Sequence, residues 1–222
     1  MGAYENGSTT RRAILDACKK LFYEKGFHAT SYDDICREAH VNRGSIYYHF
    51  KEKDNIRYEV LWEFTIANFH AAEKYCDDPV YQPSVGMYFT WYQICHDPKI
   101  NRFYTEYYDD YPVYHPETTL ACFYRTLFKH MYSGLWTDND FASLPFTSAY
   151  SYILGLMNLA RRYPGRSTAL ELYHQCFTAG NLIRGVPSSE VDKVWDIVAG
   201  YIRKIPGAEA DAILAEIVTP EG

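Results

Sequence analysis

The stretch VNRGSIYYHF, residues 41–50, brings together side chains that can read the edges of DNA bases. The planar guanidinium of Arg43 can donate two parallel hydrogen bonds to a guanine, and Tyr48 can touch a thymine methyl group. No acidic residue occurs from position 39 through 51, so nothing in this stretch repels a phosphate. The pattern favours a helix that enters a DNA groove, and the alternative is an ordinary surface helix.

The same stretch carries the local signals of a short helix. Asn42 can cap its first turn, because the side-chain oxygen accepts hydrogen bonds from the exposed N–H groups there. Gly44 keeps that turn slim enough to approach another molecule closely. Ile46 and Phe50 are four residues apart and share a face, which we expect to be buried. The polar side chains must then point elsewhere.

A longer helix is expected in front of this stretch. Apolar residues recur at three- and four-residue spacing over positions 14–22, which marks one stripe of an amphipathic helix. We expect this helix to start at Ser8 or Thr9 and to end at Gly26, because glycine accepts the left-handed conformation after a last turn. Residues 1–7 are polar and glycine-containing and are expected to fray.

A second, shorter helix is indicated by a capping pattern, Ser31 followed three residues later by Asp34, with Ile35 on its apolar face. Two short helices joined by a turn, with a longer helix in front, make a helix-turn-helix within a three-helix unit. A fourth helix is expected to start near Lys53 and to run to about Tyr75. It leaves the first unit and enters the second.

Residues from about Thr10 to Ile56 resemble the DNA-binding domain of the TetR (tetracycline-repressor-like) family of bacterial transcriptional regulators. The matching residues, in chain order, are Gly26, Phe27, Thr30, Ser31, Ile35, Ala39, Val41, Gly44, Ser45, Ile46, Tyr47, His49, Phe50 and Lys53. So many matches at fixed spacing are far more specific than a lone glycine motif. One position departs from the family pattern: His40 stands where the turn usually has glycine, and a positive φ at histidine is uncommon.

The resemblance implies a role for each side chain around the turn. The side chains expected in the major groove are those of Arg43, Ser45, Tyr47 and Tyr48. The side chains expected at phosphates are those of Ser31, Tyr32, Tyr47, His49 and Lys53. Asn42 and Gly44 would shape the start of the helix that faces the DNA. The alternative for Tyr47 and His49 is that they pack between the helices of a small core.

The net charge taken alone argues against a nucleic-acid binder, because its formal value is −6. The charge is unevenly placed, however. Residues 1–60 hold ten Lys and Arg against nine Asp and Glu, net +1, whereas residues 61–222 hold twelve against nineteen, net −7. A DNA-facing surface needs only local positive charge, so the acidic second part does not exclude one.

The rest of the chain also reads as helical. From Asp78 onward, turns that contain Pro or Gly separate segments of helical length and period with few β-branched runs. We therefore expect an all-α fold with two domains: an N-terminal three-helix helix-turn-helix domain, residues 1–55, and a C-terminal antiparallel helical bundle, residues 56–222. The resemblance implies that the second domain binds a ligand and dimerises.

Aromatic residues are concentrated in the second part, with fifteen between Tyr88 and Trp136. At helical spacing such residues are more often plain core. A core seldom prefers Tyr to Leu, however, because each buried hydroxyl needs a partner, and an apolar pocket walled by hydroxyls suits a small aromatic or amphipathic ligand. Both readings stay open. The candidate ligand-binding residues are Tyr88, Tyr92, Phe103, Tyr104, Tyr107, Tyr124 and Phe128.

A homodimer is expected from the geometry of DNA as well as from the resemblance. One short helix reads few base pairs, whereas two copies related by a twofold axis can read a palindrome with half-sites about 34 Å apart. Apolar stripes near the C-terminus can supply the interface, although they can equally be core. The candidate interface residues are Tyr152, Leu156, Leu159, Leu170, Tyr173 and Phe177.

No catalytic residue, metal site or cofactor is expected. Cys95, His96 and Asp97 are consecutive, and consecutive side chains on a helix point in different directions. His96, His115 and His130 show no zinc-ligand spacing. The six cysteines form no C-x-x-C pair and favour reduced thiols in a cytoplasm. No run of about eighteen apolar residues predicts a membrane span.

The sequence thus predicts a cytoplasmic, ligand-responsive transcriptional regulator, and the resemblance favours a repressor. As a homodimer it would bind a palindromic operator in double-stranded DNA and be released by a small apolar or aromatic ligand. The alternative is a helical small-molecule-binding or enzymatic protein whose helix-turn-helix no longer reads DNA. The acidic net charge favours that alternative slightly.

Overall fold

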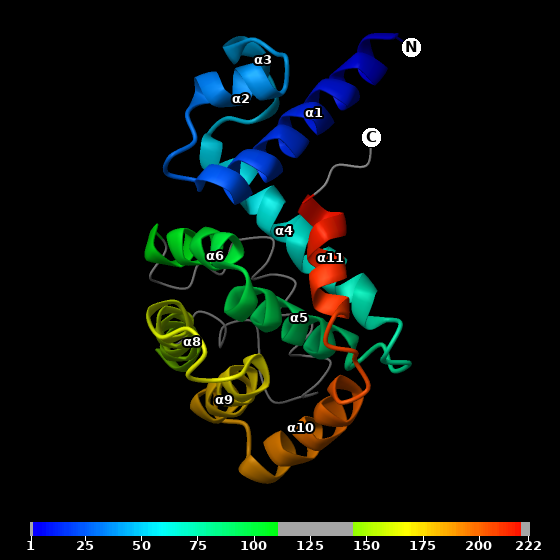
Figure 1. The fold of residues 1–222 in the computed structure, drawn as a ribbon, viewed down its shortest axis with the longest axis vertical. Coiled ribbons are helices and arrows are strands. Elements are labelled where there is room, and N and C mark those ends of the chain that lie inside the picture. The colour runs from blue at the N-terminus through cyan, green and yellow to red at the C-terminus, as the bar shows by residue number, and fades with distance from the viewer. Residues whose placement is uncertain (1, 111–143, 219–222) are drawn as a thin grey trace.

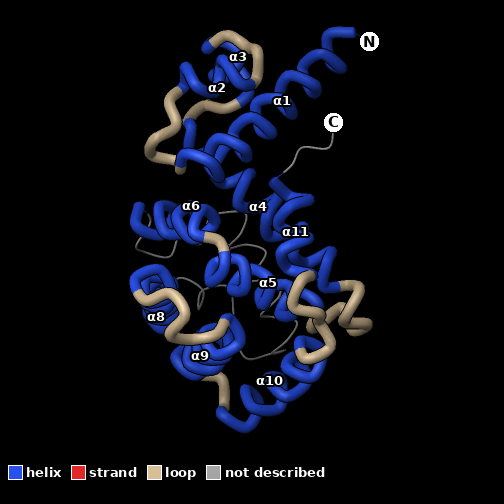
Figure 2. Tube along the Cα trace, in the orientation of Figure 1, coloured by secondary structure: helices blue, strands red, loops and turns tan. Residues whose placement is uncertain are grey.

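The computed structural model describes residues 2–110 and 144–218, and every regular element in these two ranges is an α-helix. In chain order the helices are α1 (Gly2–Lys25), α2 (Tyr32–Glu38), α3 (Arg43–His49), α4 (Lys53–Ala72), α5 (Gln82–His96), α6 (Pro98–Asp110), α8 (Leu144–Arg162), α9 (Ala169–Ile183), α10 (Ser188–Ile202) and α11 (Glu209–Val218). Helices α1 to α3 form a unit at one end of the molecule, and α4 runs from it into the larger group of helices (Figure 1). Within the described ranges loops alone connect the helices (Figure 2). The predicted all-α fold class is confirmed.

Helix α1 begins at Gly2, whereas the sequence predicted fraying over residues 1–7 and a start at Ser8 or Thr9. An exposed helix end needs no side-chain cap, since water can satisfy its free N–H groups, and most of these residues tolerate helical geometry. The helix is therefore longer at its N-terminal end than predicted.

Glycine is required at the end of α1 for two reasons. Gly26 has a φ of +95°, in the left-handed region that side chains with a Cβ rarely adopt. A Cβ at this position would also lie 2.7 Å from Oε1 of Glu106 in α6. Phe27 then folds back onto the helix, with its ring centre 5.3 Å from that of Phe22. The predicted helix end is confirmed, and the close approach of α6 adds a second constraint.

The caps of α2 and α3 are the predicted ones. The hydroxyl oxygen of Ser31 accepts a hydrogen bond from the Asp34 amide at 3.1 Å, and the Asp34 carboxylate accepts one from the Ser31 amide at 3.0 Å. At α3 the side-chain oxygen of Asn42 accepts a hydrogen bond from the Ser45 amide at 2.9 Å. These bonds satisfy N–H groups that the first turn of a helix leaves without a partner.

An apolar face holds α3 against the rest of the N-terminal unit. Ile46 is fully buried and Phe50 is 2% exposed, in one cluster with Ile14, Phe22 and Ile35. Full burial of such a side chain stabilises the fold by about 1.5–3 kcal/mol. The predicted burial of Ile46 and Phe50 is confirmed, and it fixes how α3 is rotated about its axis.

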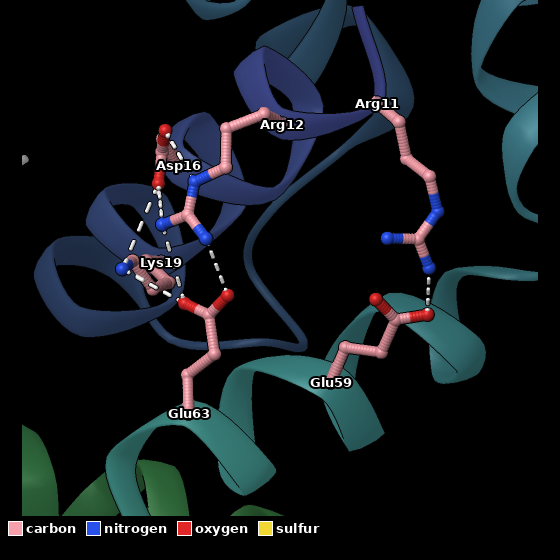
Figure 3. A network of polar contacts seen from close by, with 6 residues as sticks. All are labelled: Arg11, Arg12, Asp16, Lys19, Glu59 and Glu63. Atoms are coloured by element: carbon pink, nitrogen blue, oxygen red, sulfur yellow. Dashed lines mark hydrogen bonds and ion pairs between the residues drawn. The ribbon is translucent and has the colours of Figure 1, made fainter. Parts of the chain in front are cut away.

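Ion pairs join α1 to α4 (Figure 3). Arg12, Asp16 and Lys19 of α1 form a connected network with Glu63 of α4, and Arg11 of α1 pairs separately with Glu59 of α4. Glu63 is central, because Nη1 of Arg12 lies 2.6 Å from one of its oxygens and Nζ of Lys19 lies 2.9 Å from the other. Isolated surface ion pairs stabilise little, but a connected network with a largely buried lysine contributes more. It orients α4 against the N-terminal unit.

Helices α4 and α5 cross at close range. Gly86 allows this approach, because a Cβ there would lie 2.3 Å from Cδ1 of Phe69. Nδ2 of Asn68 donates to Oε1 of Gln93 at 3.1 Å, and Nε2 of Gln93 donates to Oδ1 of Asn68 at 3.0 Å. Asn68 also donates to the hydroxyl of Thr90. Because a buried amide is costly when unpaired, these reciprocal bonds select one register between the two helices.

Helix α5 is the centre of the second group of helices and packs against α4, α6, α8, α9, α10 and α11. Its residues Phe89 and Trp91 have no exposed surface. The hydroxyl of Tyr173 in α9 donates to the carbonyl of Ser84 in α5 at 2.6 Å. After α10, helix α11 turns back along α4 and reaches α1 (Figure 1).

Two kinds of feature are absent from residues 2–110 and 144–218. No helix there combines the length and apolar character that a bilayer crossing demands. No group of three or more His, Cys, Asp and Glu side chains there is placed to hold a metal ion.

His40, in the turn between α2 and α3, has a φ of +54°. The left-handed conformation costs a residue with a Cβ about 1–2 kcal/mol, and glycine avoids this cost while losing more freedom on folding. We expect His40→Gly to raise the free energy of unfolding by about 0.5–1 kcal/mol, measured by urea denaturation at a fixed protein concentration. His40→Ala keeps a Cβ and should stay within about 0.5 kcal/mol of wild type. An equal gain in both variants would show that backbone strain is not the cause.

Candidate nucleic-acid interface

Helix α3 presents aromatic and charged side chains to solvent. Tyr48 is 84% exposed, Tyr47 is 48% exposed and the side chain of Arg43 is 54% exposed, whereas Ile46 is fully buried. Arg43 and Tyr47 are one turn apart and share a side of the helix, with Tyr48 next to them. Because the burial of Ile46 fixes how α3 is rotated, these three predicted groove residues lie together on its outer surface.

The guanidinium of Arg43 is held by side chains of α2. Nη2 of Arg43 donates to Oδ1 of Asp33 at 3.0 Å, and Cζ of Arg43 lies 5.6 Å from the centre of the Tyr32 ring. The Tyr32 ring lies 5.2 Å from the Tyr47 ring. A cation within about 6 Å of a ring face is attracted to it. The arrangement presents planar donors beside two aromatic rings, which suits the edge of a base pair in the major groove.

Asn42, Gly44 and Ser45 build the start of α3. The side-chain oxygen of Asn42 is the cap, and the hydroxyl of Ser45 also donates to it at 3.3 Å. A Cβ at Gly44 would lie 3.2 Å from that oxygen, so glycine leaves the cap unobstructed. Asn42 and Gly44 are both exposed, as a turn that approaches another molecule requires.

His49 lies at the end of α3 and is half-buried. Its ring centre is 5.0 Å from that of Tyr48, in an edge-on arrangement. Tyr47 packs on Tyr32 with about half of its surface and leaves the rest exposed. Both residues thus combine packing with exposure, so the core alternative accounts for only part of each side chain.

Ser31 and Tyr32 lie at the start of α2, beside α3. The hydroxyl of Ser31 serves the cap and also donates to Oδ2 of Asp34 at 2.8 Å, while the residue stays exposed. Burial, and after it the neighbouring Tyr47, raises the pKa of the Tyr32 phenol above its ordinary value. Tyr32 therefore remains a hydrogen-bond donor at neutral pH.

Lys53, a predicted phosphate ligand, is used inside the protein. Its Nζ donates to the carbonyls of Phe27 and Thr30 at 2.8 Å each and lies 4.2 Å from the centre of the Phe27 ring. Burial, followed by repulsion from Arg57, lowers the pKa of the ammonium. An ammonium has three donors, so one N–H remains for a phosphate. The phosphate contact stays a prediction, and the structure gives Lys53 a second role in holding the chain between α1 and α2.

Three more charged side chains hold the same connection, and sequence reasoning missed them. Arg57 of α4 is 1% exposed; its Nη1 donates to Asp110 at 2.6 Å and its Cζ lies 3.7 Å from the centre of the Phe27 ring. Glu106 of α6 accepts the Phe27 amide at 2.6 Å. Nε2 of His28 lies 2.9 Å from Asp110. A signal existed for Arg57, because it lies three and seven residues before Val60 and Phe64 and so shares the buried face of α4 with them. Glu106 and Asp110 carry no such signal.

Residues 14–60 match the family model described as bacterial regulatory proteins, tetR family. The N-terminal unit of this chain is therefore similar to that of TetR-family regulators. AcrR, an HTH-type transcriptional regulator of Shigella flexneri, is 36% identical over 81 residues, which are 34% of this chain and 37% of AcrR. QacR, an HTH-type transcriptional regulator of Staphylococcus aureus, is 40% identical over 48 residues, 22% of this chain and 26% of QacR. The TetC protein of transposon Tn10 from Escherichia coli is 38% identical over 52 residues, 23% of this chain and 26% of TetC. The chain therefore spans little more than a third of AcrR and about a quarter of the other two.

Two solved structures of TetR-family regulators align over most of the chain at low similarity. One, from Mesorhizobium loti, is 16% identical, with a TM-score of 0.42 and coverage of 86% of this chain and 97% of that chain. The other, PfmR from Thermus thermophilus, is 19% identical, with a TM-score of 0.30 and coverage of 94% and 96%. The family assignment therefore depends on the N-terminal match.

Two of the candidate ligand-binding residues pack as core. Phe103 has no exposed surface, and its ring lies 5.4 Å from Phe64 of α4 and 6.4 Å from Phe22 of α1. Tyr107 is 5% exposed, and its ring lies 5.8 Å from that of Tyr58 in α4. These contacts support the core reading for both residues and tie α6 to α1 and α4.

The other candidate ligand-binding residues leave the pocket prediction open. Tyr104 is 4% exposed, and burial raises the pKa of its phenol, while the neighbouring hydroxyls of Thr90 and Thr65 oppose that rise. Tyr88 and Tyr92 are half-buried, with ring centres 6.2 Å apart along α5. Tyr124 and Phe128 lie outside the described residues.

The candidate dimer residues of α8 and α9 lie at two depths. Tyr173 and Phe177 are 3% and 8% exposed, and their rings lie 5.7 and 5.5 Å from that of Trp195 in α10. Because both side chains are buried within one chain, only the more exposed candidates remain available for the predicted interface. Those residues are Tyr152, Leu156 and Leu170, which are half-buried, and Leu159, which is 41% exposed.

The cap of α2 gives a test of the site's local structure. We expect Ser31→Ala to lower the free energy of unfolding by about 1 kcal/mol, because the Asp34 amide loses its acceptor. Ser31→Asn restores an accepting oxygen at the same position and should stay within about 0.5 kcal/mol of wild type. Urea denaturation at a fixed protein concentration measures both variants. Equal losses would argue that the hydroxyl matters for something other than the cap.

Proposed function

We propose that this chain is a transcriptional regulator that binds an operator in double-stranded DNA with α3. The outward face of this helix carries the proposal: Arg43, Tyr47 and Tyr48 stand exposed above the buried Ile46, and the helix contains no acidic residue. Residues 1–55 form the DNA-binding domain, and residues 56–222 form the ligand-binding and dimerisation domain. A protein that reads an operator works where the chromosome is, which places this one in the cytoplasm.

One copy of α3 can contact only a few base pairs, and a homodimer doubles the number that is read. Two copies of α3 related by a twofold axis reach half-sites about 34 Å apart in a palindrome. Apolar residues left exposed on α8, just after it and on α9 support an interface there. They are Leu159 of α8 and Tyr163 directly after it, each 41% exposed, and Leu182 of α9, 44% exposed.

A ligand acts through the connection between α1 and α2. Lys53 and Arg57 from α4 and Glu106 from α6 all bind residues of this connection, and α6 also contains Tyr104, a candidate ligand residue. A ligand that prefers one position of α6 therefore prefers one position of the N-terminal unit as well. If that position holds the two copies of α3 at a spacing that does not match successive major grooves, the affinity for DNA falls. A small apolar or aromatic ligand fits the half-buried and buried tyrosines, and the resulting regulator is a repressor released by its ligand.

An electrophoretic mobility shift tests the function directly. Promoter fragments, including the region upstream of the protein's own gene, should be shifted at lower protein concentration than random-sequence DNA of equal length. Equal affinity for all fragments, or no shift at low salt, would favour the alternative of a helical small-molecule-binding or enzymatic protein whose helix-turn-helix no longer reads DNA. Low salt is the stringent condition, because phosphate contacts strengthen as salt falls.

Arg43 separates base reading from general attraction to DNA. We expect Arg43→Ala to weaken binding to the operator by about 5- to 100-fold, the equivalent of 1–3 kcal/mol, and to weaken binding to random DNA much less. Arg37→Ala removes the same charge from α2, where the side chain pairs with Asp34, and serves as the control. Titration by fluorescence anisotropy at one salt concentration measures all four affinities. Equal losses on both DNAs for Arg43→Ala would remove Arg43 from base reading.

Glu106 tests the proposed route from α6. Glu106→Gln replaces a charged acceptor of the Phe27 amide by a neutral one, a loss of about 1 kcal/mol that should speed hydrogen exchange at this amide roughly fivefold. Glu24→Gln is the matched control, because Glu24 also pairs α1 with α6, through Lys99, but does not bind the connection. Amide exchange followed by NMR reports both. Unchanged exchange at Phe27 in the Glu106 variant would argue against this route.

A further inference from the structure

Asp33 places a carboxylate beside the reading helix, where a negative charge weakens attraction to DNA. Its side chain is 77% exposed, and its Oδ1 lies 3.0 Å from Nη2 of Arg43. The remaining acidic residue of the first turn of α2, Asp34, serves the fold, because it accepts from the Ser31 amide and pairs with Lys25. Asp33 reaches across to α3 instead. Its described contact is with the side chain that is best placed to read a base.

The pair of Asp33 and Arg43 contributes little to stability, since both partners are more than half exposed. The carboxylate of Asp33 therefore lowers the affinity for DNA without a matching gain in the stability of the fold. The geometry of the guanidinium offers another reason for the carboxylate. Asp33 holds one edge of the guanidinium, and the ring of Tyr32 lies 5.6 Å from its Cζ, with the Tyr47 ring 5.2 Å from the Tyr32 ring. A long, flexible side chain is thereby confined to one region in front of α3.

Confinement and charge both act on specificity. An arginine that is oriented before binding loses less conformational freedom when it forms two hydrogen bonds to a guanine, so the base contact is strengthened. The adjacent carboxylate also offsets its positive charge, so its attraction to phosphates at any sequence is weakened. Only the operator benefits from the strengthened base contact, whereas the weaker attraction to phosphates applies to every sequence.

We propose that Asp33 determines operator specificity by holding the guanidinium of Arg43 over the Tyr32 ring for a base contact and by reducing its attraction to phosphates. This inference rests on the proposed function of DNA reading. Asp33 is a positioning residue, since it acts through Arg43.

The test is Asp33→Asn, which keeps the size of the side chain and removes its charge. The probe is a duplex selected by the wild-type protein from a pool of random sequences, with the unselected pool as random DNA. We expect the variant to bind random DNA several-fold more tightly and to lose about 5- to 10-fold in the ratio of operator to random affinity. The slope of log affinity against log salt for random DNA should become steeper by about one phosphate contact per subunit.

Two comparisons isolate the mechanism. Glu38→Gln removes one carboxylate from the other end of α2, where it pairs with Lys20 of α1, and should leave the affinity ratio unchanged. In an Arg43→Ala background, Asp33→Asn should also leave the ratio unchanged, because its target is gone. The same shift in the Glu38 variant, or in the Arg43→Ala background, would reduce the effect to net charge and overturn the inference.

The outcomes also separate this inference from the proposed function. If the wild-type protein selects no sequence from the pool, the proposed function fails and the role of Asp33 fails with it. If the wild type selects a sequence and Asp33→Asn retains the full affinity ratio, the DNA-reading function stands and the role of Asp33 alone is refuted.

Discussion

The position of the reading helix depends on a short piece of backbone, residues 26–30, that charged side chains from outside the N-terminal unit hold in place. Arg57 is the strongest constraint among them, because a guanidinium that is 1% exposed must have its charge and donors matched. It meets this demand with Asp54, with Asp110 and with the face of Phe27. The end of α6, the start of α4 and the end of α1 are therefore fixed relative to one another. Hydrogen bonds from Arg57 and His28 lower the pKa of Asp110 although burial opposes them, so the carboxylate is ionised and the constraint is present at neutral pH.

Because α4 and α6 hold residues 26–30, a change in the second group of helices can alter the position of α3. A ligand shifts a population only as far as its affinities for the two states differ, so the site and the reading helix must share a structural element. Helix α6 is such an element. Phe103 packs against α1 and α4, and Glu106 holds an amide of the connection itself. If the proposed ligand contacts α6, the path from it to the start of α2 needs no long chain of weak contacts.

Local signals and long-range contacts differ in what the sequence discloses. The caps at Ser31 and Asn42, the stop at Gly26 and the buried pair Ile46 and Phe50 were predictable, because each depends on residues within one or two turns. The Glu106 contact joins residues 79 positions apart, and no periodicity marks it. The depth of Tyr173 is likewise invisible in its own helix, because its burial is decided by Trp195 and by the carbonyl of Ser84. The placement of the base-reading candidates on one outer face was predictable because that fold is local, whereas the packing of the ligand and dimer candidates depends on how distant helices meet.

The acidic net charge is compatible with DNA binding, because carboxylates close to α3 are paired with cationic side chains. Glu63 of α4 is neutralised by Arg12 and Lys19 of α1, and Glu38 of α2 pairs with Lys20 of α1, so these carboxylates are matched by cations of the N-terminal unit. The face of α3 then carries Arg43 with its partner Asp33 and a set of neutral aromatic and polar side chains. Such a surface attracts phosphates only weakly, because affinity for DNA of any sequence grows with the number of unpaired cations that meet it. In the proposed homodimer, DNA binding would then draw a larger share of its free energy from base edges and from the second subunit. Weak general attraction is thus a condition under which one short helix can discriminate among sequences, since the affinity that all sequences share is small.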